Sequence, residues 1–190
     1  MKKGFLAFLV GLLLITGNIT KAQVPALKVS DNKRYIATKD GKPFFWLGDT
    51  GWLTFGKLDR AGVEKYFKDR KEKGFNVVQI MVLHNINAVN VYGDAALINE
   101  DVSKPLITAG NDFKDAKQYD YWDHVDYTLD VAQKNGIYVA MVPVWGTNVS
   151  KGNKVSKEQA IEYAKFLANR YKNRTNVIWL NGGDTHGNEF

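Results

Sequence analysis

Apolar runs that alternate with amphipathic segments are the feature that most constrains the fold of this chain. Runs short enough for single strands occupy residues 44–48, 77–83, 137–144 and 177–180. Segments with apolar residues at helical spacing lie between them, at residues 58–73, 119–134 and 156–171. Buried strands that alternate with helices are typical of a parallel sheet with right-handed crossovers. The sequence therefore predicts an α/β fold made of repeated strand–helix units.

Local signals set the expected boundaries of these units. Residues 29–38 are expected to form a strand that turns back at the Asp-Gly pair of residues 40–41, which gives a short amino-terminal β-hairpin. Asp59 is expected to cap the first helix, and Ser156 with Gln159 has the spacing of a capping box before the third. The stripe that the third helix is expected to bury consists of Ile161, Ala164, Leu167 and Tyr171.

The strand ends and one long connection favour a barrel. Residues 86–118, rich in Asn, Asp and Gly, are too long for an ordinary connection and are expected to form an elaborated loop at the active face. The turns after the strands lack glycine-rich nucleotide-binding motifs and carry polar or aromatic residues, so a TIM (β/α)8-barrel type is favoured over a doubly wound sheet. Such a barrel needs roughly 250 residues, and only the first four or so βα units are present here. We therefore expect an amino-terminal fragment of a longer protein, or a pair of copies.

The first 22 residues have the pattern of an export signal peptide. Lys2 and Lys3 form a basic start, residues 5–15 an apolar run, and residues 20–22 a small-residue cleavage site. The apolar run is too short to span a bilayer, so we expect a cleaved signal and an exported protein, periplasmic or extracellular, that does not stay in the membrane. Residues 23–190 are then expected to form one partial barrel domain.

Charge and cysteine content exclude several partners and sites. Removing the signal takes away three of the 26 basic residues, which leaves 23 basic against 20 acidic residues and a net charge of +3 instead of +6. The remaining lysines are interspersed with acids, so nucleic-acid binding is not expected. The sequence has no cysteine for a disulfide or a thiolate metal site. A metal site would need His84, His124 and His186 to converge, and His124 is expected inside a helix, so neither a metal nor another cofactor is expected.

Carboxylates, amides and tryptophans gather at the expected carboxyl ends of the strands. They are Asp49, Trp52, His84, Asn85, Trp145, Asn181 and Asp184. This set fits glycosidic bond cleavage, in which one carboxylic acid protonates the leaving oxygen, a second carboxylate acts as nucleophile or base, and aromatic faces hold the sugar. Asp184 is the expected acid, and Asn181 is expected to bond a sugar hydroxyl. The alternatives are that Asp49 bonds backbone amides and that Trp52 and Trp145 belong to the core.

Six short motifs occur in order between residues 35 and 187. They are G-D-T-G-W at 48–52, D-R-K-E-K-G-F-N-V at 69–77, N-V-Y-G at 90–93, H-V-D at 124–126, G-I-Y-V-A-M-V-P-V-W-G at 136–146 and W-L-N-G-G-D at 179–184. With these motifs the chain resembles the apiosidase-like glycoside hydrolases, the family 140 type, formerly a domain of unknown function. The resemblance covers nearly all of the chain after the signal.

This resemblance implies a (β/α)8 barrel that hydrolyses O-glycosidic bonds in pectin-type side chains of plant cell-wall polysaccharides, with an oligo- or polysaccharide as substrate. It implies that Asp184, which matches the end of the family's fourth strand, is the general acid/base. The family's nucleophile is a Glu from a later strand, and no residue of this chain matches it, so the isolated chain is expected to be inactive. The alternatives are a non-catalytic carbohydrate-binding protein and an inactive truncated gene product. The sequence indicates neither the sugar and its linkage nor the oligomeric state.

Overall fold

The computed structural model describes residues 24–149 and 155–183. The expected signal peptide at residues 1–22 lies outside these ranges, as do Asp184 and His186. Within the described ranges, none of the helices combines the length and the apolar composition that crossing a bilayer requires.

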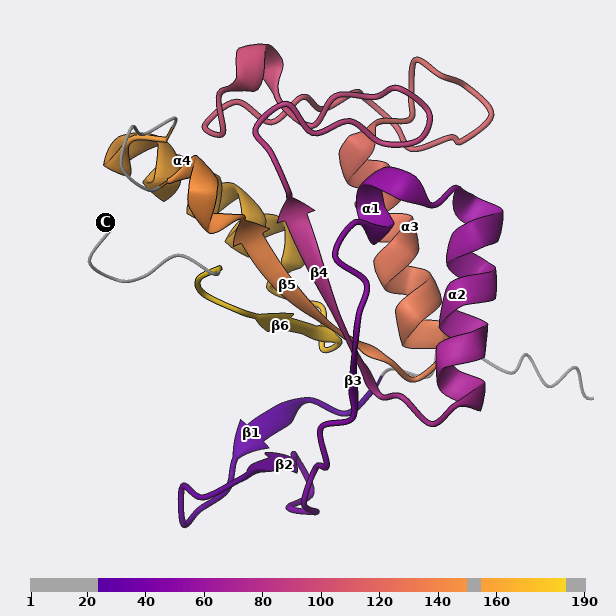
Figure 1. Cartoon of the computed structure of the whole chain (residues 1–190), viewed down its shortest axis with the longest axis vertical. Coiled ribbons are helices and arrows are strands. Elements are labelled where there is room, and N and C mark those ends of the chain that lie inside the picture. Colours follow the sequence, from indigo (N-terminus) through magenta and orange to yellow (C-terminus); the bar gives the residue numbers. More distant parts are fainter. Residues whose placement is uncertain (1–23, 150–154, 184–190) are drawn as a thin grey trace, which may run out of the picture.

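The core of the fold is a parallel sheet with its strands in the order β3-β4-β5-β6. The strands are β3 (Gly48–Thr50), β4 (Val77–Leu83), β5 (Tyr138–Val144) and β6 (Val177–Trp179). The helices that connect them are α2 (Arg60–Glu72), α3 (Tyr121–Lys134) and α4 (Lys157–Tyr171), with a short α1 (Thr54–Lys57) before α2 (Figure 1). The predicted α/β fold with a parallel sheet is therefore confirmed.

Helix starts follow the capping signals in the sequence. The Asp59 carboxylate accepts a hydrogen bond of 2.7 Å from the backbone N–H of Gly62, so α2 begins at Arg60. At the start of α4, the Ser156 hydroxyl and the Gln159 side chain form the expected reciprocal capping box. Because these side chains satisfy N–H groups that have no partner inside the helix, they fix both starts.

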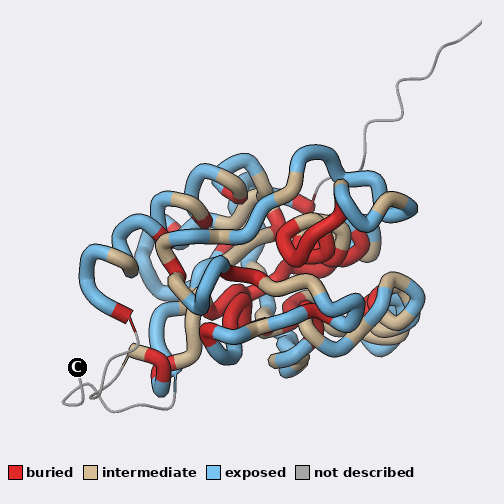
Figure 2. Tube along the Cα trace, turned by 90° about the horizontal axis from the view of Figure 1, so that it is seen from above, coloured by how far each residue is buried: buried red, intermediate tan, exposed pale blue. Residues whose placement is uncertain are grey.

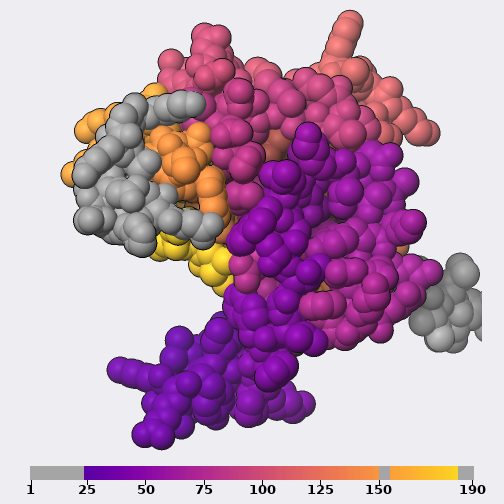
Figure 3. Space-filling model, viewed as in Figure 1, coloured from indigo at the N-terminus to yellow at the C-terminus, as the bar shows by residue number. Residues whose placement is uncertain are grey.

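The amino-terminal hairpin differs from its prediction. Its strands are β1 (Leu27–Val29) and β2 (Ile36–Thr38), which pair antiparallel, so the single strand expected over residues 29–38 is wrong. The Ser30 hydroxyl accepts hydrogen bonds from the N–H groups of Arg34 and Tyr35 and holds residues 30–35 in a turn. Such local side-chain bonds compete with strand pairing. The hairpin projects from the amino-terminal end of the sheet (Figures 1 and 3).

Helices cover one face of the sheet and bury the main core. The largest buried side chains there include Val63 and Phe67 of α2, Trp122 and Leu129 of α3, and Ile80 of β4. Figure 2 shows the buried positions gathered between exposed helix surfaces. The other face carries a smaller cluster that includes Val77 and Tyr138, against which Phe44 and Trp46 pack. Trp46 and Trp122 are therefore packing residues.

The end of the chain is less buried than the sequence predicts. In α4, Leu167 and Tyr171 are buried as expected, but Ile161 is 45% exposed and Ala164 is also exposed. The expected burial of the last strand on both faces is wrong, because Trp179 is 41% exposed. Ala164 and Trp179 line a groove beside β6, and within the described residues no strand pairs with the outer edge of β6. Ile161 lies outside the stripe that α4 buries, which consists of Tyr163, Leu167 and Tyr171.

The long connection between β4 and α3 is folded against the helices. Ala96, Leu97 and Val102 are buried in the main core, and the indole N–H of Trp122 donates a hydrogen bond of 2.9 Å to the Ala96 carbonyl. A single 3-10 turn at Ile98–Glu100 lies within it. In Figure 1 this loop lies beyond the tips of β4 and β5, at the carboxyl end of the sheet. It is the elaborated loop that the sequence predicts.

Candidate functional site

The parallel register brings the carboxyl ends of the four strands to one edge of the sheet. The registers are Asp49↔Val78 for β3 and β4, Leu83↔Val144 for β4 and β5, and Met141↔Trp179 for β5 and β6. In open and closed parallel sheets this edge is where ligands bind. Residues that follow the strands are therefore the first candidates for a site.

Two tryptophans meet at this edge. The ring centroids of Trp52 and Trp145 are 5.8 Å apart with an interplanar angle of 53°, and both side chains are partly exposed. Backbone bonds fix the pair, because the Trp52 carbonyl accepts from Met81 N–H at 3.0 Å and Trp145 N–H donates to the Leu83 carbonyl at 3.0 Å. β4 thus holds one tryptophan on each side, from strands that are not neighbours in the sheet.

The segment after β6 packs against Trp145. Leu180 N–H donates to the Met141 carbonyl at 2.9 Å, and the chain then runs past Gly182 to Gly183. A Cβ on Gly183 would lie 2.9 Å from the Gly146 nitrogen and 3.4 Å from a ring carbon of Trp145. Only glycine fits this approach. The backbone immediately before Asp184 therefore lies beside Trp145, while Asp184 itself is outside the described residues.

Asn148 ties two strand ends together and was not among the predicted site residues. Its side-chain amide is buried and donates to the carbonyls of His84 at 3.0 Å and Trp145 at 3.1 Å. The polar run after β5 was a signal for such a residue. His84 and Asn85 are exposed at the same rim, so their side chains face solvent at the end of β4.

Asp49 lies on the helix-facing side of the sheet. Its carboxylate accepts hydrogen bonds from the Tyr66 hydroxyl at 2.7 Å and from Arg70 Nη1 at 2.8 Å, both on α2. Burial alone would raise the pKa of Asp49, but the hydrogen bonds from Tyr66, from the backbone N–H of Thr50 and from Arg70 outweigh it, and the pKa lies below its usual value. These contacts hold α2 on the sheet, and we assign Asp49 to structure rather than to substrate binding.

Asn181 also faces the helices rather than the tryptophan pair. It is exposed and lines an apolar groove with Tyr163 and Leu167 of α4 and with Trp179. Alternation along the strand explains this position, because Val177 packs against the helix-side core whereas Ile178 and Leu180 pack against the other cluster. The predicted bond from Asn181 to a sugar therefore lacks support from its position.

His124 is a structural residue of α3. Its ring is fully buried, with Nε2 2.8 Å from the Leu58 carbonyl and Nδ1 3.1 Å from the Tyr119 hydroxyl. A carbonyl only accepts, so Nε2 carries the proton and Nδ1 accepts from Tyr119. Burial lowers the pKa of His124 and favours this neutral form. Among the described residues no group of three or more side chains could hold a metal ion.

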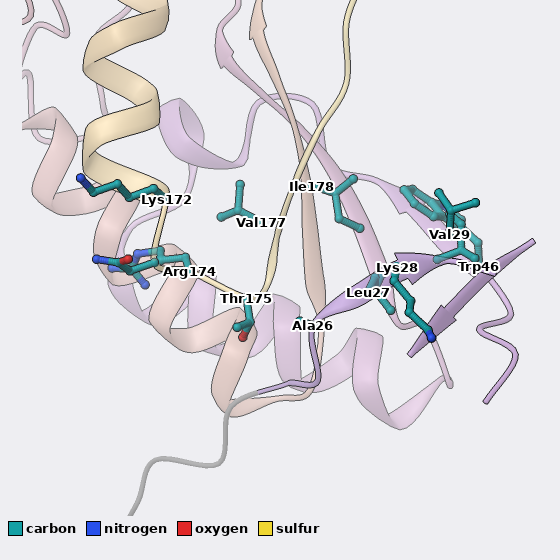
Figure 4. Close-up of a pocket in the computed structure, with 12 residues that line it drawn as sticks. Ala26, Leu27, Lys28, Val29, Trp46, Lys172, Arg174, Thr175, Val177 and Ile178 are labelled. Atoms are coloured by element: carbon teal, nitrogen blue, oxygen red, sulfur yellow. The ribbon is translucent and has the colours of Figure 1, made fainter. Parts of the chain in front are cut away.

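A cavity of about 480 Å³ lies away from this edge, at the start of β6 (Figure 4). Its walls come from the hairpin, with Leu27 and Val29, and from the segment between α4 and β6, with Lys172 and Thr175. It contains none of the strand-end candidates. The tryptophan edge, and not this cavity, is therefore the candidate active site.

Solved structures of similar proteins bear on the identity of the chain. It aligns with a structure named glycoside hydrolase at 39% identity and a TM-score of 0.75, over 87% of this chain and 35% of that one. It also aligns with a glycoside hydrolase family 5 structure from Bacteroides vulgatus at 40% identity and a TM-score of 0.76, over 86% of this chain and 34% of that one. The chain thus spans about a third of the length of these relatives.

More distant structures share the fold alone. An endo-1,4-beta-mannanase from Rhizomucor miehei aligns at 13% identity with a TM-score of 0.53, over 80% of this chain and 46% of that one. The comparison with curated proteins found no match. The profile of the apiosidase-like catalytic domain matches residues 30–189, most of the chain. The chain belongs to the apiosidase-like family through its catalytic domain.

Proposed function

We propose that this chain contributes the saccharide-binding rim and the general acid/base of a glycoside hydrolase. The observation that carries the proposal is the contact between Trp52 and Trp145 at the carboxyl edge, beside the backbone that leads to Asp184. Paired aromatic faces at a strand edge suit a sugar, whose C–H groups pack on them while its hydroxyls remain in water. Membership of the family supports hydrolysis of a glycosidic bond as the reaction.

Asp184 has the role of proton donor in this proposal. A carboxylic acid protonates the leaving oxygen, and a second carboxylate stabilises or attacks the sugar carbon. The resemblance assigns the first group to Asp184 and the second to a Glu on a later strand. Asp49 and Asn181 have no role in this proposal, because the Asp49 carboxylate is bonded to Tyr66 and Arg70 and Asn181 lines the groove beside α4.

We further propose that the four strands are the first half of a (β/α)8 barrel. Two apolar hollows support this reading, because they flank β6. A groove of about 340 Å³ lies between β6 and α4, and the cavity of about 480 Å³ lies beside Val177 and Ile178. A further strand on the free edge of β6, followed by a helix over the groove, would cover both. The greater length of the relatives agrees with such an addition.

The substrate class proposed is a pectin-type side chain of plant cell-wall polysaccharide, met by an exported enzyme. Both statements rest on the family resemblance and on the signal-like first 22 residues. A non-catalytic carbohydrate-binding protein is the second candidate. It is favoured by the tryptophan pair, which is formed entirely by the described residues.

Measurements of saccharide binding and of hydrolysis distinguish the glycoside hydrolase from the non-catalytic carbohydrate-binding protein. Calorimetry with pectic oligosaccharides should show binding by this chain, and Trp145→Ala should weaken it about tenfold, as expected for the loss of one aromatic contact. Trp179→Phe is the matched control, since Trp179 is exposed but faces the helices. In a longer version that carries the later strands, Asp184→Asn should abolish hydrolysis and preserve binding. Unchanged hydrolysis would overturn the acid/base assignment, and binding without hydrolysis by the longer protein would favour the second candidate.

A further inference from the structure

The two limbs of loop 86–118 converge on the first residue of α2. From the first limb, the Tyr92 hydroxyl accepts a hydrogen bond of 2.8 Å from the backbone N–H of Arg60. From the second limb, the Phe113 ring lies 4.6 Å from Arg60 Cζ. The rings of Tyr92 and Phe113 also touch each other edge to face, with centroids 5.3 Å apart. Arg60 is therefore the point where both limbs are fastened to the body of the protein.

The guanidinium of Arg60 is enclosed by aromatic rings. Its Cζ lies 3.6 Å from the ring centroid of Tyr127 on α3, 4.6 Å from that of the loop residue Phe113, and 5.9 Å from that of Tyr119. Arg60 forms no ion pair with a carboxylate of the described residues. Cation–π contacts with Phe113 and Tyr127 therefore hold its side chain, and a planar guanidinium is suited to such contacts.

His124 supports this arrangement from within α3. Its ring stacks on Tyr127 with an interplanar angle of 21° and meets Tyr92 edge to face at 5.4 Å. The bond from its Nε2 to the Leu58 carbonyl holds the residues just before Arg60. The start of α2, the middle of α3 and the first limb of the loop are therefore packed as one unit.

The loop is also held at its far side. The Gln159 side chain on α4 donates a hydrogen bond of 2.9 Å to the Asp101 carboxylate. The loop thus reaches from α2 to α4 past the tips of the strands (Figure 1). It starts directly after His84 and Asn85, at the rim that carries the tryptophan pair. A loop fastened in this way forms a wall beside that rim.

We propose that Arg60 is a positioning residue for this wall. By clamping both limbs of loop 86–118 between α2 and α3, it holds the loop in the shape that meets the saccharide at the end of β4. The identity of the ligand rests on the proposed function, whereas the clamp itself is measured without any substrate. Arg60 touches neither the tryptophan pair nor the strand ends, so it acts through the loop.

Hydrogen exchange of the 190-residue chain tests the clamp. In Arg60→Leu, amides of residues 89–93 and 108–118 should exchange about tenfold faster, as expected for loss of the aromatic contacts. Amides of β4 and β5 should be unchanged. In Arg60→Lys, which keeps the charge and loses the planar guanidinium, the loop amides should exchange at rates between those of Arg60→Leu and the unchanged protein. Arg34→Leu in the exposed hairpin turn is the matched control and should have no effect.

Two outcomes overturn the proposal. One is unchanged loop exchange in Arg60→Leu, and the other is equal acceleration in every element, which would mean a general loss of stability. If Arg60→Leu fails to fold, Phe113→Leu removes the same contact from the loop side, where the ring is 41% exposed, and must show the same local acceleration.

A kinetic arm links the clamp to the site. In a longer, hydrolytically active version, Arg60→Leu should raise KM about tenfold and leave kcat within about twofold, with partial recovery in Arg60→Lys. A fall in kcat at unchanged KM would contradict a positioning role. If the longer protein shows no hydrolysis, the proposed function fails, while the exchange result still decides the clamp.

Discussion

Replacing Asp49 by asparagine should destabilise the fold by about 1.5 kcal/mol at neutral pH and leave saccharide binding unchanged. The substitution keeps the shape and one hydrogen-bond acceptor but removes the charge. It therefore tests whether the Asp49 carboxylate holds the helix layer, as its contacts indicate, or binds the substrate.

The magnitude follows from two hydrogen bonds and their exposure. The Asp49 carboxylate accepts from Tyr66 at 2.7 Å and from Arg70 at 2.8 Å, and the side chains of Asp49 and Arg70 are 24% and 21% exposed. Hydrogen bonds to charged groups contribute about 1.5 to 3 kcal/mol when buried, and fully exposed ion pairs contribute about 0 to 1 kcal/mol. The partly buried pair lies between these limits. A loss of about 1.5 kcal/mol corresponds to a fall in Tm of about 3 to 6 °C for a chain of this size.

The effect should depend on pH in one direction. The pKa of Asp49 in the folded protein lies below its usual value, because the bonds from Tyr66, from the backbone N–H of Thr50 and from Arg70 outweigh the effect of burial. The unfolded chain then binds the proton more tightly than the folded one, so the stabilisation is complete above the ordinary aspartate pKa and is lost as the pH falls through the folded pKa. The difference in Tm between the two proteins should narrow below about pH 4.

Thermal melts at pH 7 and pH 3, combined with calorimetry on pectic oligosaccharides, measure both quantities. Asp31→Asn is the control, because the Asp31 side chain is 97% exposed. Its carboxylate forms a surface ion pair with Lys28, with Oδ1 3.6 Å from Nζ. That surface pair should contribute less than about 0.5 kcal/mol. Equal melting of Asp49→Asn and the unchanged protein, or loss of binding without loss of stability, would refute the assignment.

Three further substitutions give separate results. Trp122→Phe should lower the unfolding free energy by about 2 kcal/mol in denaturant titrations, since it removes the indole hydrogen bond to the Ala96 carbonyl and opens a void; no change would contradict its buried contacts. Burial raises the pKa of Asp123 to about 6, so its ionisation opposes folding as the pH rises; Asp123→Asn should gain Tm relative to the unchanged protein between pH 5 and 7, and a constant difference would refute this. Gly183→Ala should cost about 1 to 3 kcal/mol and alter Trp145 fluorescence, because its Cβ would meet backbone at 2.9 Å; an unchanged spectrum and stability would contradict that approach.

Element type and order were predictable from sequence because each signal was local. The continuous apolar run at 77–83 gives β4 with the same boundaries, and the capping residues Asp59 and Ser156 give the starts of α2 and α4. The turn after Val29 was not predictable from hydrophobicity, because it depends on one hydroxyl, that of Ser30, which bonds two backbone N–H groups. Such a local hydrogen bond does not alter the hydrophobic periodicity of the sequence.

The site was predictable only to the level of the edge. Parallel order places Trp52 and Trp145 at one end of the sheet, but their contact depends on β4 lying between β3 and β5 and on the bonds that fix both ends to it. The contacts of Arg60 could not be predicted from the sequence, because its partners, among them Phe113 and Tyr127, come from distant segments. No spacing rule connects such positions.

Alternation along a strand explains why position at a strand end is a weak guide to function. Asp49 pairs with Val78, whose side chain lies in the helix-side core, and its carboxylate is used there. Asn181 shares the helix-facing groove for the same reason. Only every second residue of a strand faces the side opposite the helices. Gly182 ends this alternation, because its φ of +111° is a backbone conformation that side chains other than glycine rarely adopt. The facing of Gly183 therefore does not follow from the alternation of the strand.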